Sequence, residues 1–360
     1  MRLLILGTGK MANQHATRFA AIPGVQLVGA VDTNVEKLDA FCDTHAIEKR
    51  FVTVAEALAW GEFDAVSNVT PDAAHHPTTM ACIAAGKHVL CEKPLATNHA
   101  HAVEMADAAE AAGVVAMVNL SYRNVAELHA AREMVLSGRI GAVKHVEASY
   151  LQSWLVSKAW GDWRTGSQWL WRLSRGHGSN GTLGDIGIHI LDFAAYGAAT
   201  DIQDISCRLK TFHKAEGDRI GEYVLDANDS FVMTAQFGNG ALGVVHATRW
   251  ATGHINELRL RIYGDKGSIE VQHAHNGSSL RACLDEDAEA AVWREIEAQP
   301  VATNYERFVS AVRLDIASEP GFRHAAGLQR ILDMAAADVE ENAPDVRARR
   351  RRMVRSNAQS

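Results

Sequence analysis

Two short motifs carry side chains that could move a proton at a substrate. In Glu92-Lys93-Pro94, Lys93 follows a short apolar run, and the glycine-rich segment 181–192 places Asp185 and His189 four residues apart. On a helix such residues share one face, and a histidine held beside a carboxylate keeps a fixed tautomer and a raised pKa, which suits acid–base chemistry. From the residues alone, two structural interpretations stay open: Lys93 as a surface lysine, and Asp185 with His189 as a helix cap and a core histidine.

A glycine-rich turn after the first apolar run predicts a nucleotide site. Gly7-Thr8-Gly9-Lys10-Met11-Ala12 has the spacing G-x-G-x-x-A of the dinucleotide fingerprint. Gly7 permits a tight turn, and Gly9 lets the backbone approach a pyrophosphate at the helix N-terminus. Asp32 stands about 20 positions further on, where a carboxylate binds the adenosine ribose and repels a 2′-phosphate. The motif therefore predicts NAD as cofactor, with NADP less favoured. A glycine turn in another α/β fold is the alternative.

The elements expected around these motifs change character near residue 120. Short apolar runs alternate with helical segments before it, which indicates βαβ units and a parallel sheet, and ligands bind at the carboxyl ends of such strands. Longer runs of alternating polarity follow, separated by turns at Gly238-Asn239-Gly240 and 264–267, and they predict an antiparallel-rich sheet. The fold predicted is α/β: a Rossmann domain with a doubly wound parallel sheet over 1–120, an α+β domain with a large, mostly antiparallel open sheet over 121–345, and a basic tail over 346–360.

The predicted elements can be given by residue. Strands are expected at 3–6, 26–31, 65–69, 87–91, 114–119, 143–151, 230–236, 242–248, 257–263 and 268–273. Helices are expected at 10–21, 34–45, 75–85, 98–112, 123–137, from about 184 onward, 304–314 and 328–342.

Composition excludes several classes of protein. The chain has 360 residues, 47% of them hydrophobic and 22% charged, and a net charge of −7. Six arginines lie in 346–355, so the remainder is acidic, which argues against a dedicated nucleic-acid binder. Five widely spaced cysteines without a CxxC predict a reducing, cytoplasmic setting, and we expect no signal peptide, membrane span or metal site. The pairs His99/His101 and His273/His275 are interpreted as solvated histidines. The basic tail is interpreted first as a solvated or disordered tail, then as an arm on an acidic neighbouring subunit, and last as a nucleic-acid contact.

A tryptophan-rich segment precedes the Asp185 motif and indicates the substrate class. Five of the eight tryptophans lie between 154 and 171. Trp163 and Trp171 are each followed by an arginine, Arg164 and Arg172. Aromatic faces suit the C–H faces of sugar rings, so these four residues are predicted to bind a sugar, cyclitol or glycoside. A hydrophobic flap or subunit contact is the alternative, and the arginines would equally suit an acidic sugar.

Taken together, the motifs resemble the Gfo/Idh/MocA family of NAD(P)-dependent oxidoreductases. The resemblance rests on GTGKMA at 7–12, Asp32, TPDAAH at 70–75, EKP at 92–94 and GTLGDIGIH at 181–189. The segments NYERF at 304–308 and GLQRIL at 327–332 also match, so the resemblance covers most of the chain. Asp72, Ala126 and Asn180 depart from the usual pattern outside the residues proposed for chemistry.

The resemblance implies a reaction and a set of roles. Lys93 and His189 would be the catalytic pair, with Asp185 holding the substrate or orienting His189, in the reversible oxidation of a secondary hydroxyl by hydride transfer to nicotinamide C4. The cofactor would be bound by Gly7, Thr8, Gly9, Lys10, Met11, Asp32, Thr70, Pro71, His75, Glu92 and Lys93. The substrate would be bound by Lys93, Tyr122, Arg123, Trp163, Arg164, Trp171, Arg172, Asp185 and His189. The resemblance further implies a homodimer or homotetramer formed through the second sheet. An NAD-dependent glycosidase and a non-catalytic NAD-binding regulator are the alternatives.

Overall fold

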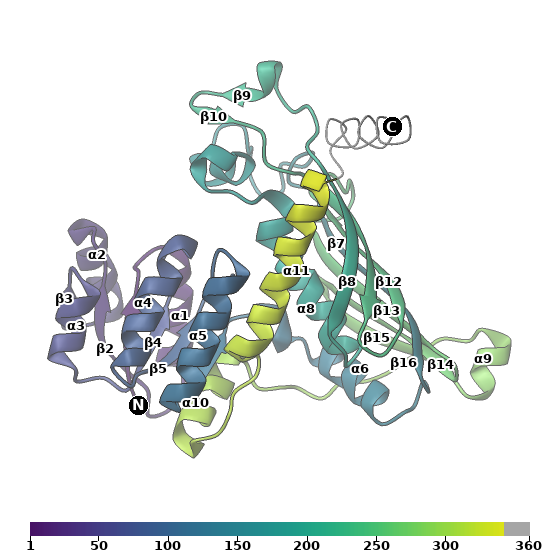
Figure 1. Ribbon diagram of the computed structural model, residues 1–360, viewed down its shortest axis with the longest axis horizontal. Helices are drawn as coiled ribbons and strands as arrows, with labels where there is room; N and C mark the ends of the chain where they lie inside the picture. Colours follow the sequence, from purple (N-terminus) through teal and green to yellow (C-terminus); the bar gives the residue numbers. More distant parts are fainter. Residues whose placement is uncertain (342–360) are drawn as a thin grey trace, which may run out of the picture. The chain divides into compact units, whose positions relative to one another are not determined.

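The chain folds into two units, shown with their helices and strands in Figure 1. The computed structural model describes residues 1–341, with side chains to 338, so the predicted basic tail at 346–360 lies outside the described residues. Unit 1 comprises Met1–Asn124 and Val301–Arg330, and unit 2 comprises Val125–Pro300 and the chain from Ile331. The sequence had assigned 301–330 to the second domain. The structure places this segment in unit 1 because Tyr305 and Phe308 pack in the same buried cluster as Phe19.

Unit 1 is built on a six-stranded parallel sheet in the order β3-β2-β1-β4-β5-β6. This is the strand order of a Rossmann fold. Its strands are β1 (Arg2–Leu6), β2 (Gln26–Val31), β3 (Lys49–Phe51), β4 (Ala65–Asn68), β5 (His88–Cys91) and β6 (Ala116–Val118). Its helices are α1 (Lys10–Ala20), α2 (Val35–His45), α3 (Val54–Trp60), α4 (Asp72–Ala84), α5 (His99–Ala112), the 3₁₀ turn η1 (Ser121–Asn124) and α10 (Asn304–Leu314).

The central strand β1 is apolar on both faces because helices cover both sides of the sheet. Leu3 and Ile5 belong to a buried cluster with residues of α1, α2 and α10, while Leu4 and Leu6, on the alternate face, are equally buried. The order in which the chain adds strands to the sheet reverses between β1 and β4, which is the switch point where such folds bind ligands.

Unit 2 is built on an eight-stranded sheet in the order β16-β15-β14-β13-β7-β12-β11-β8. Only β7 and β12 pair in parallel within this sheet as described. Its strands are β7 (Val143–Gln152), β8 (Ile202–Lys210), β11 (Ser230–Phe237), β12 (Leu242–Thr248), β13 (Asn256–Gly264), β14 (Gly267–Ala274), β15 (Gly277–Leu284) and β16 (Arg294–Glu295), beside a small hairpin of β9 (Arg219–Ile220) and β10 (Tyr223–Val224).

Helices α6 and α8 pack on this sheet, and α11 (Phe322–Glu341) crosses the division between the units. The helical elements of unit 2 are α6 (Ala126–Leu136), α7 (Ser167–Leu170), α8 (Ile188–Gly197), α9 (Glu286–Ala290), the 3₁₀ turns η2 (Trp171–Leu173), η3 (Arg175–His177) and η5 (Glu216–Asp218), and the π-helical turn η4 (Leu183–Gly187). The sheet's other face carries ion pairs, such as those of Arg261 with Glu147 and Glu270.

The predicted elements agree with the described ones apart from several short or weakly patterned segments. The sequence did not indicate β3, α3, β8 and β15 or the short elements β9, β10, β16, α7 and α9, and α11 begins earlier than predicted, at Phe322. The helix expected from about residue 184 is present: its first turn is π-helical, and it continues as α8. Among the helices described, none combines the length and the apolar character that a membrane crossing requires.

Candidate active site

Asp32, the residue directly after β2, is hydrogen-bonded to the glycine turn that follows β1. The Asp32 Oδ2 accepts hydrogen bonds from the Thr8 backbone N–H (2.9 Å) and the Thr8 hydroxyl (2.8 Å), and Oδ1 accepts one from the Asn34 N–H (2.9 Å). Burial raises the pKa of Asp32, but these hydrogen bonds outweigh it and hold the pKa below its ordinary value. Asp32 is therefore an ionised acceptor that also braces the turn, a second role that the sequence did not indicate.

The turn has the shape that a dinucleotide pyrophosphate needs. Gly7 has a φ of 85°, and a Cβ there would stand 2.8 Å from the Val69 carbonyl oxygen, so the turn lies directly against the chain leaving β4. A Cβ on Gly9 would meet nothing within 4 Å among the described residues, and no described side chain caps α1. The first turn of α1 therefore has no side-chain cap, and a ligand can approach the backbone closely at Gly9, as phosphate binding at a helix N-terminus requires. Thr8 is buried, whereas Lys10 and Met11 are exposed beside the turn.

Lys93 lies two residues after the end of β5, at the carboxyl edge of the parallel sheet, and is half-buried. The peptide bond between Lys93 and Pro94 is cis. The Lys93 backbone N–H donates to the Glu92 Oε2 (3.1 Å). The turn that carries the lysine is therefore anchored to the side chain that precedes it.

Glu92 is the centre of a buried polar network. Its Oε1 lies 2.8 Å from the His15 Nε2 on α1 and accepts a hydrogen bond from the Asn119 amide at 2.6 Å, while the His15 Nδ1 lies 2.7 Å from the Ser67 hydroxyl. The Asn119 amide also donates to the Tyr305 hydroxyl (3.3 Å). The resemblance placed Glu92 among the cofactor-binding residues. The structure instead turns its carboxylate inward, where it joins the nucleotide-binding helix to the turn that carries Lys93.

The pKa of Glu92 predicts a pH-dependent stability. Burial would raise this pKa, but His15 and Asn119 lower it from 4.5 to about 2. The stabilisation from the carboxylate is thus complete above about pH 4.5 and is lost as the pH falls toward 2. Glu92→Gln should reduce the free energy of unfolding at pH 7 by about 3–5 kcal/mol, because it leaves the buried side chains of His15 and Asn119 without the carboxylate that they contact. In denaturant titrations, the difference in the free energy of unfolding between wild type and Glu92→Gln should become smaller below pH 4.5.

The matched control for this variant is Glu48→Gln, whose side chain is 86% exposed beside Lys49. This exposed pair should change stability by less than about 1 kcal/mol at any pH. A Glu92→Gln gap that stays constant from pH 7 to pH 3 would contradict the assignment of a buried, ionised Glu92.

The remaining predicted site residues of unit 1 differ in how far they are buried. Arg123 is buried, with its guanidinium Nη2 3.0 Å from the His324 Nε2, and its carbonyl accepts from Arg307. It is therefore part of the interior of unit 1 rather than a residue presented to substrate. Tyr122, beside it, is half-buried. At the end of β4, the Thr70 hydroxyl donates to the Asn68 Oδ1 (2.7 Å) and Pro71 is exposed, whereas His75 is fully buried.

In unit 2, Asp185 lies in the π-helical turn and His189 in the first turn of α8. π-Helical turns occur frequently at functional sites. Asp185 is paired with Arg249, whose Nη2 donates a hydrogen bond to the Asp185 Oδ2 at 2.8 Å. Arg249 is fully buried, and the sequence did not indicate it as a site residue. The side chain of Asp185 is 30% exposed, whereas that of Arg249 is fully buried. The ion pair therefore leaves part of the Asp185 carboxylate accessible to solvent.

Arg249 could have been found from the pattern of β12. Val245 and Ala247 are buried and Arg249 continues the same alternation, which puts an arginine at an inward-facing position. Its Nη1 donates to the Arg172 carbonyl (3.1 Å), and its backbone N–H donates to the Asp229 carbonyl (3.0 Å). A buried arginine needs such partners to offset its desolvation.

The tryptophan-rich segment folds into a cluster of its own. Trp163 is buried in it and donates its indole N–H to the Leu155 carbonyl (3.1 Å), so it is core and not a substrate surface, and the exposed Arg164 stacks over it. Trp171 is 39% exposed, with the Arg172 guanidinium 4.5 Å from its ring centre. The Arg172 Nε lies 3.8 Å from the Asp185 Oδ2. Of the four residues predicted here, the structure brings Arg172 to Asp185, and Trp171 stacks against Arg172.

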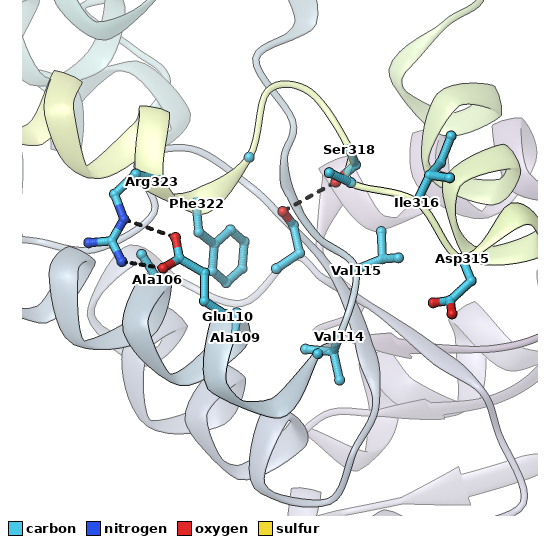
Figure 2. A pocket seen from close by; sticks show the side chains of 14 residues that line it. Ala106, Ala109, Glu110, Val114, Val115, Asp315, Ile316, Ser318, Phe322 and Arg323 are labelled. Carbon is cyan, nitrogen blue, oxygen red and sulfur yellow. Dashed lines mark hydrogen bonds and ion pairs between the residues drawn. The ribbon is translucent and has the colours of Figure 1, made fainter.

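A separate pocket of about 390 Å³ opens on unit 1 between the end of α5 and the segment 315–323. Figure 2 shows the Arg323 guanidinium hydrogen-bonded to the Glu110 carboxylate at one side of the pocket. At the other side, the Ser318 hydroxyl donates a hydrogen bond to the Ala116 carbonyl oxygen. Because α5 ends and β6 begins here, the pocket lies at the amino edge of the parallel sheet. It is thus distinct from the carboxyl edge that carries Lys93. No group of three or more His, Cys, Asp or Glu in the part of the chain that is described could hold a metal ion.

Comparison with known proteins identifies the family. Residues 1–120 match the model for an oxidoreductase family with an NAD-binding Rossmann fold, and residues 128–270 match the GFO/IDH/MocA C-terminal domain. The chain is a member of the Gfo/Idh/MocA family. It is an NAD(P)-dependent oxidoreductase, and its first domain is an NAD-binding Rossmann domain.

Relatives cover most of this Gfo/Idh/MocA chain. It is 27% identical to levoglucosan dehydrogenase of Pseudarthrobacter phenanthrenivorans over 319 aligned residues. The aligned region covers 82% of this chain and 80% of the relative. It is 30% identical over 277 residues to scyllo-inositol 2-dehydrogenase (NADP(+)) IolU of Bacillus subtilis, which spans 76% and 77%. The crystal structure of an oxidoreductase domain protein from Kribbella flavida superimposes with a TM-score of 0.83 at 29% identity, covering 94% and 97% of the two chains.

Proposed function

We propose that this oxidoreductase reversibly oxidises a secondary hydroxyl of a sugar, cyclitol or glycoside. The observation that carries the proposal is the anchoring of both candidate catalytic motifs. Lys93 lies on a turn that is hydrogen-bonded to the buried Glu92 network, and Asp185, four residues before His189, is paired with the buried Arg249. Residues held in this way are pre-organised for chemistry, whereas a regulator that only binds NAD would not need them.

Each side chain has a definite task in the proposed reaction. Bound NAD⁺ supplies the hydride acceptor at C4 of its nicotinamide. His189 accepts the proton of the reacting hydroxyl, and Lys93 donates a hydrogen bond to the same oxygen as its charge develops. Asp185 stays ionised because Arg249 is paired with it, so it accepts a hydrogen bond from a neighbouring hydroxyl and fixes the substrate's orientation.

The substrate class is supported by the relatives and by the surface beside Asp185. Relatives are named for levoglucosan and scyllo-inositol, which are both polyhydroxylated rings. The exposed face of Trp171 suits ring C–H groups, and Arg172 supplies donors to hydroxyl oxygens. An NAD-dependent glycosidase would use the same groups for a transient oxidation and is the second candidate.

A panel of sugars, cyclitols and glycosides with NAD⁺ and NADP⁺ tests the proposal. We expect reduced nicotinamide to accumulate with at least one polyol. Cleavage of a glycoside without net cofactor reduction would favour the glycosidase. A chain that binds NAD but converts nothing in the panel would favour the regulator and contradict the proposal.

We also propose that the protein is a cytoplasmic homodimer or homotetramer. The five cysteines are all free and buried, which suits a reducing compartment. The outer face of the unit 2 sheet, with Val232 and Leu242 exposed among its ion pairs, is the proposed subunit surface. No membrane or nucleic-acid partner is proposed.

Cofactor choice gives a prediction at Asp32. Asp32→Ser removes the ribose acceptor and the repulsion of a 2′-phosphate, so Kd for NAD⁺ should rise about tenfold or more while Kd for NADP⁺ falls. Because Asp32 also braces Thr8, the matched variant is Thr8→Val, which removes only the hydroxyl bond. Thr8→Val should raise Kd for NAD⁺ and Kd for NADP⁺ by the same factor. Fluorescence titration of the two dinucleotides checks this, and an unchanged NAD⁺-to-NADP⁺ preference in Asp32→Ser would contradict the assignment.

A further inference from the structure

His75 has an arrangement of partners that the proposed reaction does not use. It lies in the N-terminal part of α4 and is fully buried. Its Nδ1 is 2.7 Å from the Pro94 carbonyl oxygen, and its Nε2 is 2.9 Å from the Thr70 carbonyl oxygen. These two carbonyl groups belong to the segments that leave the neighbouring strands β4 and β5 at the carboxyl edge of the sheet.

Two carbonyl partners fix the protonation state of the ring. A carbonyl oxygen only accepts hydrogen bonds, and a neutral imidazole carries a single N–H. In the neutral form one ring nitrogen would press its lone pair against a carbonyl oxygen in a buried site, which is costly. The imidazolium form donates to both oxygens and removes this conflict.

We propose that His75 is a fixed imidazolium that ties the Thr70 turn to the Lys93-Pro94 turn and thereby positions Lys93. Both ring nitrogens are committed to the backbone, so His75 acts through Lys93 and is not itself a catalytic residue. The resemblance implied that His75 binds the cofactor. The present proposal gives it a different task, and its positioning part rests on the proposed role of Lys93.

The surroundings support a cation at this position. Burial opposes protonation, but Cys91 on β5, the Pro94 carbonyl and Asp72 on α4 raise the pKa of His75 from 6.5 to about 9. The N-terminus of α4 acts against a cation, so the two carbonyl dipoles are the groups that compensate it at hydrogen-bond distance. The Thr70 turn is itself held by the Asn68 side chain, which makes it a firm anchor.

Nitrogen-15 NMR of the full chain labelled at histidine tests the protonation state without any substrate. The chain has 17 histidines, and His75→Gln identifies the signal by its loss, with His76→Gln, the neighbour paired with Glu104, as matched control. We expect both His75 nitrogens to give protonated-type signals at pH 7 and to keep them until the pH approaches 9. An unprotonated ring nitrogen at pH 7 would overturn the proposal. If His75→Gln does not fold, the wild type still decides: a spectrum at pH 8 in which every histidine is neutral also overturns it.

Kinetics test the positioning part. His75→Gln should lower kcat by roughly 10- to 100-fold while KM for NAD⁺ changes by less than about threefold, because the pyrophosphate and ribose contacts remain. His76→Gln should leave both constants unchanged. Wild-type kcat in a folded His75→Gln variant would refute positioning even if the imidazolium is observed. An inactive wild type would instead count against the proposed function and leave the NMR result to stand.

Discussion

Replacing Lys93 with Met is expected to lower kcat by about 10²- to 10⁴-fold while leaving Kd for NAD⁺ nearly unchanged. The loss arises because the variant keeps the length of the side chain but removes the donor and charge that polarise the reacting oxygen. NAD⁺ affinity is retained because the glycine turn and Asp32 belong to other elements, at the ends of β1 and β2. Stopped-flow reduction of the cofactor and a separate NAD⁺ titration measure the two quantities.

A matched lysine and chemical rescue sharpen the test of Lys93. Lys49 is partly exposed in the same unit beside Glu48, so Lys49→Met should retain full activity. Lys93→Ala should regain part of its activity when small primary amines are added, since they can restore the missing donor. A Lys93→Met variant that turns over at the wild-type rate would show that this lysine is only a surface residue.

Replacing His189 with Asn is expected to lower kcat and kcat/KM together, each by about 10²- to 10⁴-fold. This pattern follows when a residue acts in the transition state, because a lost proton acceptor affects the chemical step and not ground-state binding. His189 is only 7% exposed, so the change should be accompanied by a thermal unfolding scan of the variant. Steady-state kinetics on the best substrate of the panel provide the rate constants.

His213→Asn is the control for His189. His213 has a side chain that is 73% exposed beside Asp218 in the same unit, and its replacement should leave kcat unchanged. A folded His189→Asn variant with raised KM and normal kcat would mean that His189 only binds substrate. That result would remove it from the proposed acid–base role.

The fold of unit 1 could be predicted because its signals are local. The apolar run at Leu3–Leu6, the glycine turn and the acid at Asp32 lie within about 30 residues, and each reports on backbone geometry next to it. The assignment of 301–330 failed because nothing local shows where a helix docks. Tyr305 and Phe308 pack in a core whose other members, apart from those of α10 itself, lie between Leu3 and Met117.

The direction and partners of the site residues could not be predicted for the same reason. Glu92 sits next to Lys93 in the chain, but its carboxylate is turned inward by His15, 77 residues away. Asp185 has its principal cation at Arg249, 64 residues away, and only the inward alternation of β12 hinted at it. Trp163 and Trp171 have the same residue type and a following arginine, and packing alone makes one core and the other exposed.

Transfer of deuterium from substrate to cofactor tests the central claim most directly. The polyol that gives the strongest signal in the panel is labelled with deuterium at the carbinol carbon and oxidised with NAD⁺. If the chain oxidises a secondary hydroxyl by hydride transfer, deuterium will appear at C4 of the reduced nicotinamide, and the labelled substrate will react more slowly in a single turnover. Reduced cofactor that carries no deuterium, or a labelled carbon that keeps its deuterium while the cofactor is reduced, would contradict the account.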